Sequence, residues 1–187
     1  LKKSYLQTSH LRCRRCDNEL ETLPHVLGSC KWNDAQRTAR HHDLKNDLRK
    51  MLEQKGYDCI DEAFCLDNNK SHRFIDILAF DRKSDKAFII DPTVRFETNE
   101  DVGAIADAEK KQIYESCIPN LELRYADKGK HQWEVIGLWF RTRGTVSKQM
   151  VDFFDRFKLD KNRLPELAEN VLTASIKILE CFMYKRN

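Results

Sequence analysis

The chain has 187 residues, of which 41% are hydrophobic and 34% are charged, with a net charge of +3. This length can bury one substantial core, and the composition is typical of a globular domain, which excludes disordered and fibrous classes. No stretch approaches the roughly 18 apolar residues of a membrane helix, and the start of the chain lacks the apolar core of a signal peptide, so we expect an intracellular protein with no membrane partner.

The first 15 residues carry five basic side chains and no acidic one, whereas charges of both signs are interspersed along most of the chain. Such a segment is typical of a phosphate-contacting surface, and a solvated basic tail is the alternative. The five side chains are Lys2, Lys3, Arg12, Arg14 and Arg15.

Residues 1–32 show no helical or strand periodicity, but they contain three cysteines and a histidine at metal-ligand spacing. The pattern is C-x2-C-x8-H-x4-C, formed by Cys13, Cys16, His25 and Cys30. Tetrahedral zinc takes four such ligands, and so short a segment has no other evident way to order itself. We predict a structural Zn²⁺ site here, with His10 as a rival ligand and unrelated thiols as the alternative.

The chain has seven cysteines in all. An odd number with uneven spacing argues against a disulfide framework and favours a reducing compartment. Outside the metal-ligand pattern the cysteines lie in apolar or strand-like surroundings and are predicted to be reduced core residues: Cys59, Cys65, Cys117 and Cys181.

Regular elements are predicted after residue 32. A helix is expected at 35–55, because Asn33-Asp34 can cap its start, Gly56 can end it, and its apolar residues share one side. Strands are predicted at 57–66, 72–80 and 87–97. A helix at 102–117, ended by Pro119, a strand at 133–141 and helices at 148–157 and 164–184 follow.

This order of elements predicts an α/β fold with a mixed central sheet flanked by helices. Residues 33–187 would form this domain, and residues 1–32 would form a small zinc-binding segment before it.

Two neighbouring strands each carry an aspartate among apolar residues, Asp76 in HRFIDILAF and Asp91 in AFIIDPTVRFE. A turn at Lys83-Ser84 pairs position 76 with 91, 77 with 90 and 78 with 89, which places both carboxylates on one face. Like charges in partly buried positions are costly, and a divalent cation would remove that cost. A solvated aspartate at one strand end and a turn cap at the other are the alternative.

Lys110 and Tyr114 are four residues apart on the predicted helix 102–117, so their side chains share one helix face. Two carboxylates suit Mg²⁺, which lowers the pKa of a water and neutralises charge on a phosphate, while an ammonium group can orient that water or stabilise the transition state. Together these groups suit phosphodiester hydrolysis. For Lys110 and Lys111 an ordinary solvated helix face is the alternative.

Asp76, Asp91 and the helical lysine resemble the PD-(D/E)-x-K nuclease superfamily. The cysteine segment with ETLPHVLGSC, then RFIDILAF, IIDPTVRFE, EKKQIY and RTRGTVSK, resembles the carboxy-terminal region of site-specific non-LTR retrotransposon polyproteins over nearly the whole chain. This resemblance implies a CCHC zinc knuckle followed by a restriction-like endonuclease. In that family the nuclease nicks target DNA so that the upstream reverse transcriptase can prime synthesis, and a nuclear location follows.

The resemblance assigns the catalytic metal, Mg²⁺ or Mn²⁺, to Asp76 and Asp91, with the main-chain carbonyl of Pro92 as a further oxygen ligand. Two departures from the superfamily stand out. The proline that precedes the first acid is absent, and Thr93 replaces the usual lysine after the second acid.

In the retrotransposon branch that lysine lies on the following helix, within a K-x-x-K-Y-like run. Lys110 stands four residues before Tyr114, as this run requires, and both are assigned to catalysis by the resemblance. Ile113 occupies the place of the second lysine, which leaves Lys111 as a substitute.

Four further residues have open roles. Glu53 and Glu97 are candidates for a third carboxylate. Arg40 and His41 match an Arg-His pair of the family, and a helix-surface cluster is the alternative for both.

A nuclease must hold DNA across its metal centre through contacts that position the strand. The candidates for these contacts are Arg73, Arg95, Arg141, Arg143 and Lys148. The knuckle would supply a second surface, for target DNA or element RNA, through Arg12, Arg14 and Arg15.

Two other functions stay open. The first is a nucleic-acid-binding module of the same polyprotein that is catalytically inactive in isolation, which Thr93 and the missing proline motivate. The second is a protein interaction domain in which the aspartates solubilise strand ends and zinc has only a structural role in stabilising the fold.

Overall fold

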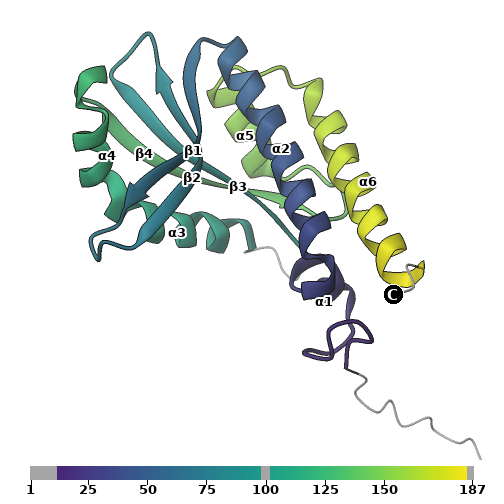
Figure 1. The fold of residues 1–187 in the computed structure, drawn as a ribbon. Helices are drawn as coiled ribbons and strands as arrows, with labels where there is room; N and C mark the ends of the chain where they lie inside the picture. Colours follow the sequence, from purple (N-terminus) through teal and green to yellow (C-terminus); the bar gives the residue numbers. More distant parts are fainter. Residues whose placement is uncertain (1–11, 98–101, 185–187) are drawn as a thin grey trace, which may run out of the picture.

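A computed structural model describes residues 12–97 and 102–184. A four-stranded sheet with helices on both faces forms the domain (Figure 1), which confirms the predicted α/β architecture. The strand order is β1-β2-β3-β4, and the sheet is mixed because β3 and β4 are parallel while the other pairs are antiparallel. The strands are β1 (Tyr57–Leu66), β2 (His72–Asp81), β3 (Lys86–Arg95) and β4 (Gln132–Arg141).

The helices divide between the two faces of the sheet (Figure 1). One face is covered by α2 (Asp34–Gln54), α5 (Lys148–Arg156) and α6 (Arg163–Tyr184), and the other by α3 (Val102–Tyr114) and α4 (Ile118–Arg124). The short helix α1 (Leu23–Gly28) lies beside α6. Single 3-10 turns occupy Lys31–Asn33, Glu115–Cys117 and Ala126–Lys128. Among the described residues 12–97 and 102–184, none of the helices is long and apolar enough to cross a bilayer.

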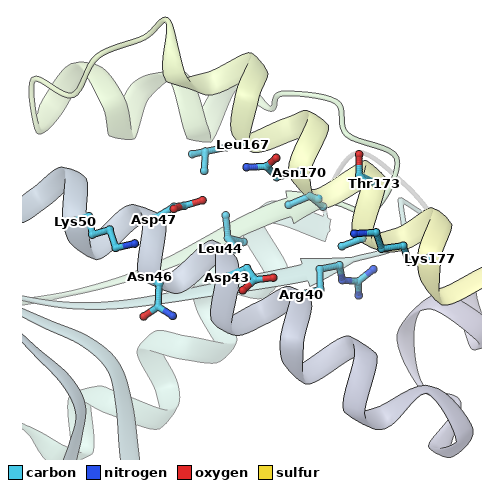
Figure 2. Close-up of a pocket in the computed structure, with 12 residues that line it drawn as sticks. Arg40, Asp43, Leu44, Asn46, Asp47, Lys50, Leu167, Asn170, Thr173 and Lys177 are labelled. Atoms are coloured by element: carbon cyan, nitrogen blue, oxygen red, sulfur yellow. The ribbon is translucent and has the colours of Figure 1, made fainter.

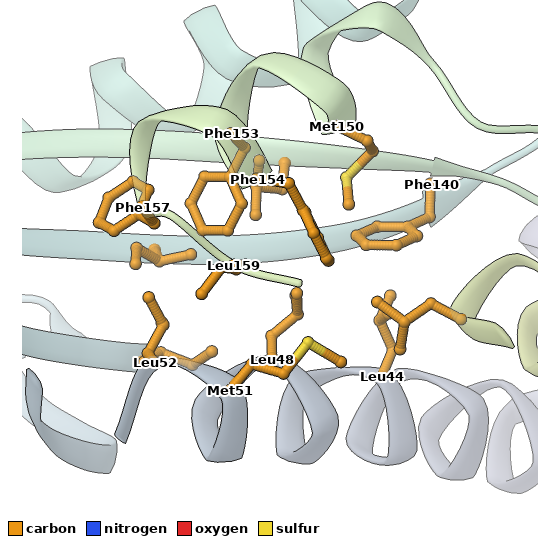
Figure 3. Close-up of a cluster of buried hydrophobic side chains, with 14 of the residues drawn as sticks. Leu44, Leu48, Met51, Leu52, Phe140, Met150, Phe153, Phe154, Phe157 and Leu159 are labelled. Carbon is orange, nitrogen blue, oxygen red and sulfur yellow. The ribbon is translucent and has the colours of Figure 1, made fainter. Parts of the chain in front are cut away.

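The core on the α2 face fixes that helix to the sheet. Leu44, Leu48 and Leu52 recur every four residues, so they share one side of α2 and point toward Phe153 and Phe154 of α5 (Figure 3). Full burial of one such side chain contributes roughly 1.5–3 kcal/mol. The position of α2, and of the polar residues on its neighbouring side, is therefore well determined.

The core on the opposite face holds α3 and the segment after it. Tyr114, Cys117 and Leu121 pack against sheet residues that include Leu78 and Ile89, and all five are buried. This packing places the end of α3 and the segment after it against β2 and β3, while the body of α3 lies along β4.

Two short helices were absent from the sequence prediction. In α1 the Thr22 hydroxyl accepts a hydrogen bond from the His25 amide, and Pro24 lies in the first turn, where it needs no backbone donor. Pro119 was predicted only to end a helix. It also lies in the first turn of α4, so the chain continues from α3 through the 3-10 turn Glu115–Cys117 into a second helix.

The predicted hairpin register is confirmed for two of its three pairs, because Ile77 pairs with Ile90 and Leu78 with Ile89, but the predicted pair of Asp76 with Asp91 is not part of the ladder. Pairing between β2 and β3 extends from here to the turn, while β3 stays paired with β4 through Arg95. The sheet therefore forks just before Ile77 and just after Ile90. Asp76 and Asp91 are the next residues on each strand.

Where the sheet forks, the side chains of β2 also change the face of the sheet toward which they point. Ile77 belongs to the core on the α2 face, and strict alternation would put Ile75 there too, yet Ile75 packs on the α3 face. On β1 the adjoining Glu62 has a left-handed backbone with φ of 49°, a conformation that costs about 1–2 kcal/mol for a residue with a side chain. This exchange of faces accompanies the turn of the Asp76 side chain toward α2.

Candidate functional site

Asp91 is a buried carboxylate with a partner on each oxygen. Its Oδ1 lies 2.8 Å from Lys110 Nζ, and its Oδ2 accepts a hydrogen bond of 2.8 Å from Tyr114 Oη. The Asp91 side chain is 4% exposed and that of Lys110 is 20% exposed, so the ion pair has limited contact with solvent. The structure thus brings together three of the four residues that the resemblance assigns to catalysis.

Asp76, the fourth, faces the opposite helical layer, so the prediction that both carboxylates lie on one face of the sheet is wrong. The strands separate before these two positions, which frees each side chain to turn to a different layer. Its Oδ1 accepts a hydrogen bond of 3.2 Å from His41 Nε2 on α2, and its side chain is 14% exposed. His41, whose role was open from sequence, thereby becomes part of the aspartate centre, which we define as His41, Asp76, Asp91, Lys110 and Tyr114.

The charges in the aspartate centre influence one another. Burial raises the pKa of Asp91, and the negative charge of Asp76 raises it further, while Lys110 and Tyr114 act in the opposite direction. The hydrogen bond to Asp76 raises the pKa of His41. The charge of Asp76 therefore acts on Asp91 although the two side chains face different helical layers, and a cation that contacts both would relieve that repulsion.

Gly137 of β4 lets α3 approach the sheet closely enough for Lys110 to reach Asp91. A Cβ atom at this position would lie 2.7 Å from Asp107 Cα and 3.0 Å from Lys110 Cβ. The Gly137 amide also donates a hydrogen bond of 2.9 Å to Asp107 Oδ1. Only a residue without a side chain fits here, so Gly137 determines the height of Lys110 above the sheet.

The donor chemistry of the centre fits a hard divalent cation, because Asp76 and Asp91 supply carboxylate oxygens. A cation on Asp91 would have to displace Lys110 from Oδ1 or Tyr114 from Oδ2, since both oxygens have partners. Pro92 is buried in β3 in register with Leu138 of β4. Its carbonyl as a further ligand stays a prediction.

The two candidate third carboxylates are not brought to the aspartate centre. Glu53 pairs with Arg49 at 2.6 Å and lies twelve residues beyond His41, about 18 Å along α2. Glu97 lies after the end of β3 and pairs with Arg143 at 3.4 Å.

Lys45 is a residue of this region that the sequence analysis missed. It lies one helical turn after His41, its side chain is 3% exposed, and its Nζ is 2.9 Å from Asp61 Oδ1 and contacts Glu62. A lysine between the core positions Leu44 and Leu48 of α2 is the signal that would have pointed to a buried cation.

The four predicted zinc ligands form a metal-binding cluster. Their ligand atoms all lie within 4.8 Å of one another, so Cys13, Cys16, His25 and Cys30 can hold a metal ion such as zinc. The Cys13 and Cys30 sulfurs are 3.7 Å apart, close to the ~3.8 Å that two sulfurs at 2.3 Å from one tetrahedral ion would show. The rival ligand His10 lies outside the described residues.

Neighbouring groups orient the cluster. His25 Nε2 faces Cys16 Sγ at 3.2 Å, and the opposite nitrogen, Nδ1, lies 2.9 Å from Glu19 Oε2. A carboxylate on the outer nitrogen of a histidine fixes the tautomer that leaves the inner nitrogen able to bind a metal. A hydrogen bond from the Asn18 backbone lowers the pKa of Cys16 to about 7, whereas burial raises that of Cys30 to about 11.

The cluster segment packs onto the end of α6 and does not stand apart from the sheet domain. Cys13, Val26 and Cys30 share a small core with Phe182 of α6, and the Arg15 guanidinium lies over the Trp32 ring at 4.9 Å. The Nε–H of Arg15 also donates to the Phe182 carbonyl at 2.9 Å.

Most of the predicted phosphate contacts are engaged within the chain. Arg14 pairs with Glu21, Arg73 with Asp67, Arg95 with Glu109 and Arg143 with Glu97. Arg12 donates to the Asp17 carbonyl, and Arg141 lies over the Trp139 ring. Arg95 and Arg141 are in register on β3 and β4, so these two gather at one end of the sheet. Lys2 and Lys3 lie outside the described residues.

Two pockets meet at Arg40. One, of about 400 Å³, separates α2 from α6, and polar side chains of both helices face each other across it (Figure 2). The other, of about 330 Å³, lies between α1, α2 and β3 and includes His41. Arg40 is 4% exposed and donates to the Leu27 carbonyl and the Ser175 hydroxyl, which contradicts the helix-surface alternative for this residue.

Comparisons with known proteins leave the family open. No family model matches the chain, and no curated protein does. A solved structure, that of the protein of unknown function AF1548, aligns with 76% of this chain and 98% of its own at 9% identity and a TM-score of 0.36.

Proposed function

We propose that this chain is a divalent-metal-dependent DNA endonuclease that hydrolyses a phosphodiester bond. The observation that supports the proposal most is the position of Asp76 and Asp91 at the fork of the sheet, directly beyond the last paired residues Ile77 and Ile90, with Lys110 in contact with Asp91. Buried like charges of this kind are costly unless a cation joins them, and perturbed charged clusters of this kind are frequent at functional sites.

Each residue of the aspartate centre has its own role in the proposed reaction. Asp76 and Asp91 hold Mg²⁺ or Mn²⁺, which when bound activates water and neutralises charge on the phosphate. Lys110, released from Asp91, donates hydrogen bonds to the negative charge that builds on the phosphate oxygens. Tyr114 and His41 hold the two carboxylates in place, one from each helical layer.

The resemblance to retrotransposon polyproteins suggests the biological process in which this activity takes part. In that setting the enzyme nicks target DNA in the nucleus, and the reverse transcriptase domain of the same polyprotein primes synthesis from the nick. The cluster of Cys13, Cys16, His25 and Cys30 holds a structural zinc and forms the knuckle, whose surface contacts target DNA or element RNA.

A plasmid-nicking assay tests the proposal. Supercoiled DNA with Mg²⁺ or Mn²⁺ is incubated with the wild-type chain, with Asp76→Asn or Asp91→Asn, and with Asp127→Asn, an exposed aspartate of the 3-10 turn Ala126–Lys128, as the control. We expect both substitutions in the centre to reduce nicking on the order of 100-fold or more, and the control to match wild type. Equal nicking by all four proteins would show that another site or a contaminant cuts the DNA.

One observation favours a second candidate, a nucleic-acid-binding module without catalysis. Both oxygens of Asp91 already have partners, and Thr93 stands where the superfamily has a lysine. This candidate predicts binding of DNA without divalent metal and no cleavage of any plasmid or branched substrate.

A further inference from the structure

The pocket between α1, α2 and β3 carries a concentration of positive charge beside the aspartate centre. Arg37, Arg40, His41 and Arg95 line its walls, and Asp34 is the acidic residue of its lining. Cationic walls in a concave site attract anions, because the low-dielectric surroundings strengthen each interaction.

Two of these arginines have donors that nothing in the described chain satisfies. The Nε–H groups of Arg37 and Arg40 are buried and have no hydrogen-bond partner among the described residues. Arg40 is itself 4% exposed, and each of its two terminal nitrogens donates one hydrogen bond, to the Ser175 hydroxyl and to the Leu27 carbonyl. A buried donor without an acceptor costs about 1–3 kcal/mol, and Arg49 on the same helix has an unpartnered Nε–H as well. What distinguishes Arg37 and Arg40 is that they line a concave site together with His41 and Arg95, where an anion with several oxygens would meet several cationic groups.

The pocket adjoins the aspartate centre through one shared residue. His41 lines the pocket and also donates to Asp76. On the opposite wall, Thr93 and Arg95 belong to the part of β3 that β2 has left. A strand of nucleic acid in the fork would therefore pass directly from the two aspartates into the pocket.

We propose that this pocket binds a backbone phosphate of DNA next to the bond that is cut, so that the strand runs from the aspartate centre toward the zinc cluster. The direction of the strand rests on the proposed nuclease function, whereas phosphate binding in the pocket does not. Asp34 opposes the ligand from the rim, where it pairs with Arg37 at 2.7 Å and is 75% exposed.

Salt-dependent DNA binding by matched variants tests this proposal. The affinity of a labelled 20-base-pair duplex is measured by fluorescence anisotropy over a range of salt concentrations, without added divalent metal. The variants are Arg37→Gln, Asp34→Asn and the control Arg49→Gln, which breaks an ion pair of similar kind with Glu53 on the same helix. Thermal melts verify that each variant folds, and Arg95→Gln replaces Arg37→Gln if the latter does not.

We expect Arg37→Gln to weaken binding severalfold and to reduce the slope of log affinity against log salt by about one. Asp34→Asn should strengthen binding, and Arg49→Gln should match wild type. The same slope for Arg37→Gln and Arg49→Gln, or no binding by wild type at low salt, would overturn the pocket assignment.

Nicking assays on the same variants separate the two proposals. A reduced slope in a chain that never nicks DNA supports the pocket and overturns the nuclease. Nicking by wild type, combined with an unchanged slope for Arg37→Gln, supports the nuclease and overturns the pocket.

Discussion

Lys110 and Lys111 are neighbours on α3 with different partners. Lys110 pairs with Asp91 in the aspartate centre, whereas Lys111 pairs with Asp107 at 2.6 Å on the more exposed side of the helix. We therefore predict that Lys110→Gln lowers nicking on the order of 100-fold, because it removes charge stabilisation at the phosphate, while Lys111→Gln stays near wild type. Rate constants for the two variants under one set of conditions check this, and equal losses would contradict the assignment of Lys110.

Asp67 controls the turn that precedes β2, and its effect depends on pH. Backbone hydrogen bonds from Ser71 and Asn69, together with the Arg73 side chain, lower the pKa of Asp67. Since the folded-state pKa lies below the unfolded value of about 3.9, the ionised carboxylate stabilises the fold above that pH, and this contribution is lost as pH falls through the lowered pKa.

We accordingly predict that Asp67→Asn lowers the melting temperature at pH 7 and that its difference from wild type shrinks below about pH 4. Melting curves of both proteins between pH 3 and pH 7 measure this difference. If the difference in melting temperature between the two proteins stayed constant over this range, the charge of Asp67 would not contribute to stability.

At the scale of elements, α3 owes its place to Gly137. An alanine there would meet Asp107 and Lys110, and α3 would have to move away from β4. We predict that Gly137→Ala destabilises the fold by about 1–3 kcal/mol and also lowers nicking, because Lys110 moves with the helix. Gly28→Ala is the matched control, since its Cβ would meet nothing within 4 Å. Equal melting temperatures for the two variants would contradict this role of Gly137.

Elements with strong periodicity are predictable from the sequence. The four-residue recurrence of Leu44, Leu48 and Leu52 indicates α2, and the apolar runs around Asp76 and Asp91 indicate β2 and β3. The helices α1 and α4 escape prediction, because six and seven residues are too few to show a period. Their existence depends on capping at Thr22 and on Pro24 and Pro119 in first turns, and on packing against the remainder of the chain.

The candidate site is predictable only in part for a similar reason. The register that brings Asp76 and Asp91 to one level follows from counting residues around the turn, and the spacing of Lys110 and Tyr114 follows from helical geometry. The contact between His41 and Asp76 depends on the bend at Glu62 and on the exchange of faces in β2. Those features arise from tertiary packing, and no local sequence pattern in β1 or β2 indicates them.

At the scale of the whole molecule, the cluster of Cys13, Cys16, His25 and Cys30 connects to the sheet domain through α1 and α6. The Leu27 carbonyl of α1 accepts from Arg40, and the cluster cysteines share a core with Phe182. We predict that metal removal lowers the melting temperature, because α1 loses the ligand bond at His25 and loosens its contacts with both helices.

Metal content and melting curves check this prediction. Cys13→Ser should lose bound zinc and melt at a lower temperature, and a chelator should bring the wild-type chain to the same value. Cys181→Ser, which changes a cysteine outside the cluster, should keep both the metal and the wild-type melting temperature. If a chelator left the wild-type melting curve unchanged, metal binding by the cluster would not contribute to the stability of the domain, which would contradict the prediction.

In the function that we propose, Asp76 and Asp91 together hold a divalent cation at the fork of the sheet. Anomalous diffraction from a crystal soaked in Mn²⁺ tests it most directly. We predict an anomalous peak between the two carboxylates, with the Lys110 ammonium or the Tyr114 hydroxyl displaced from Asp91, and no such peak in Asp91→Asn crystals. Full soaking without a peak at the fork, or with Mn²⁺ bound elsewhere, would contradict the account.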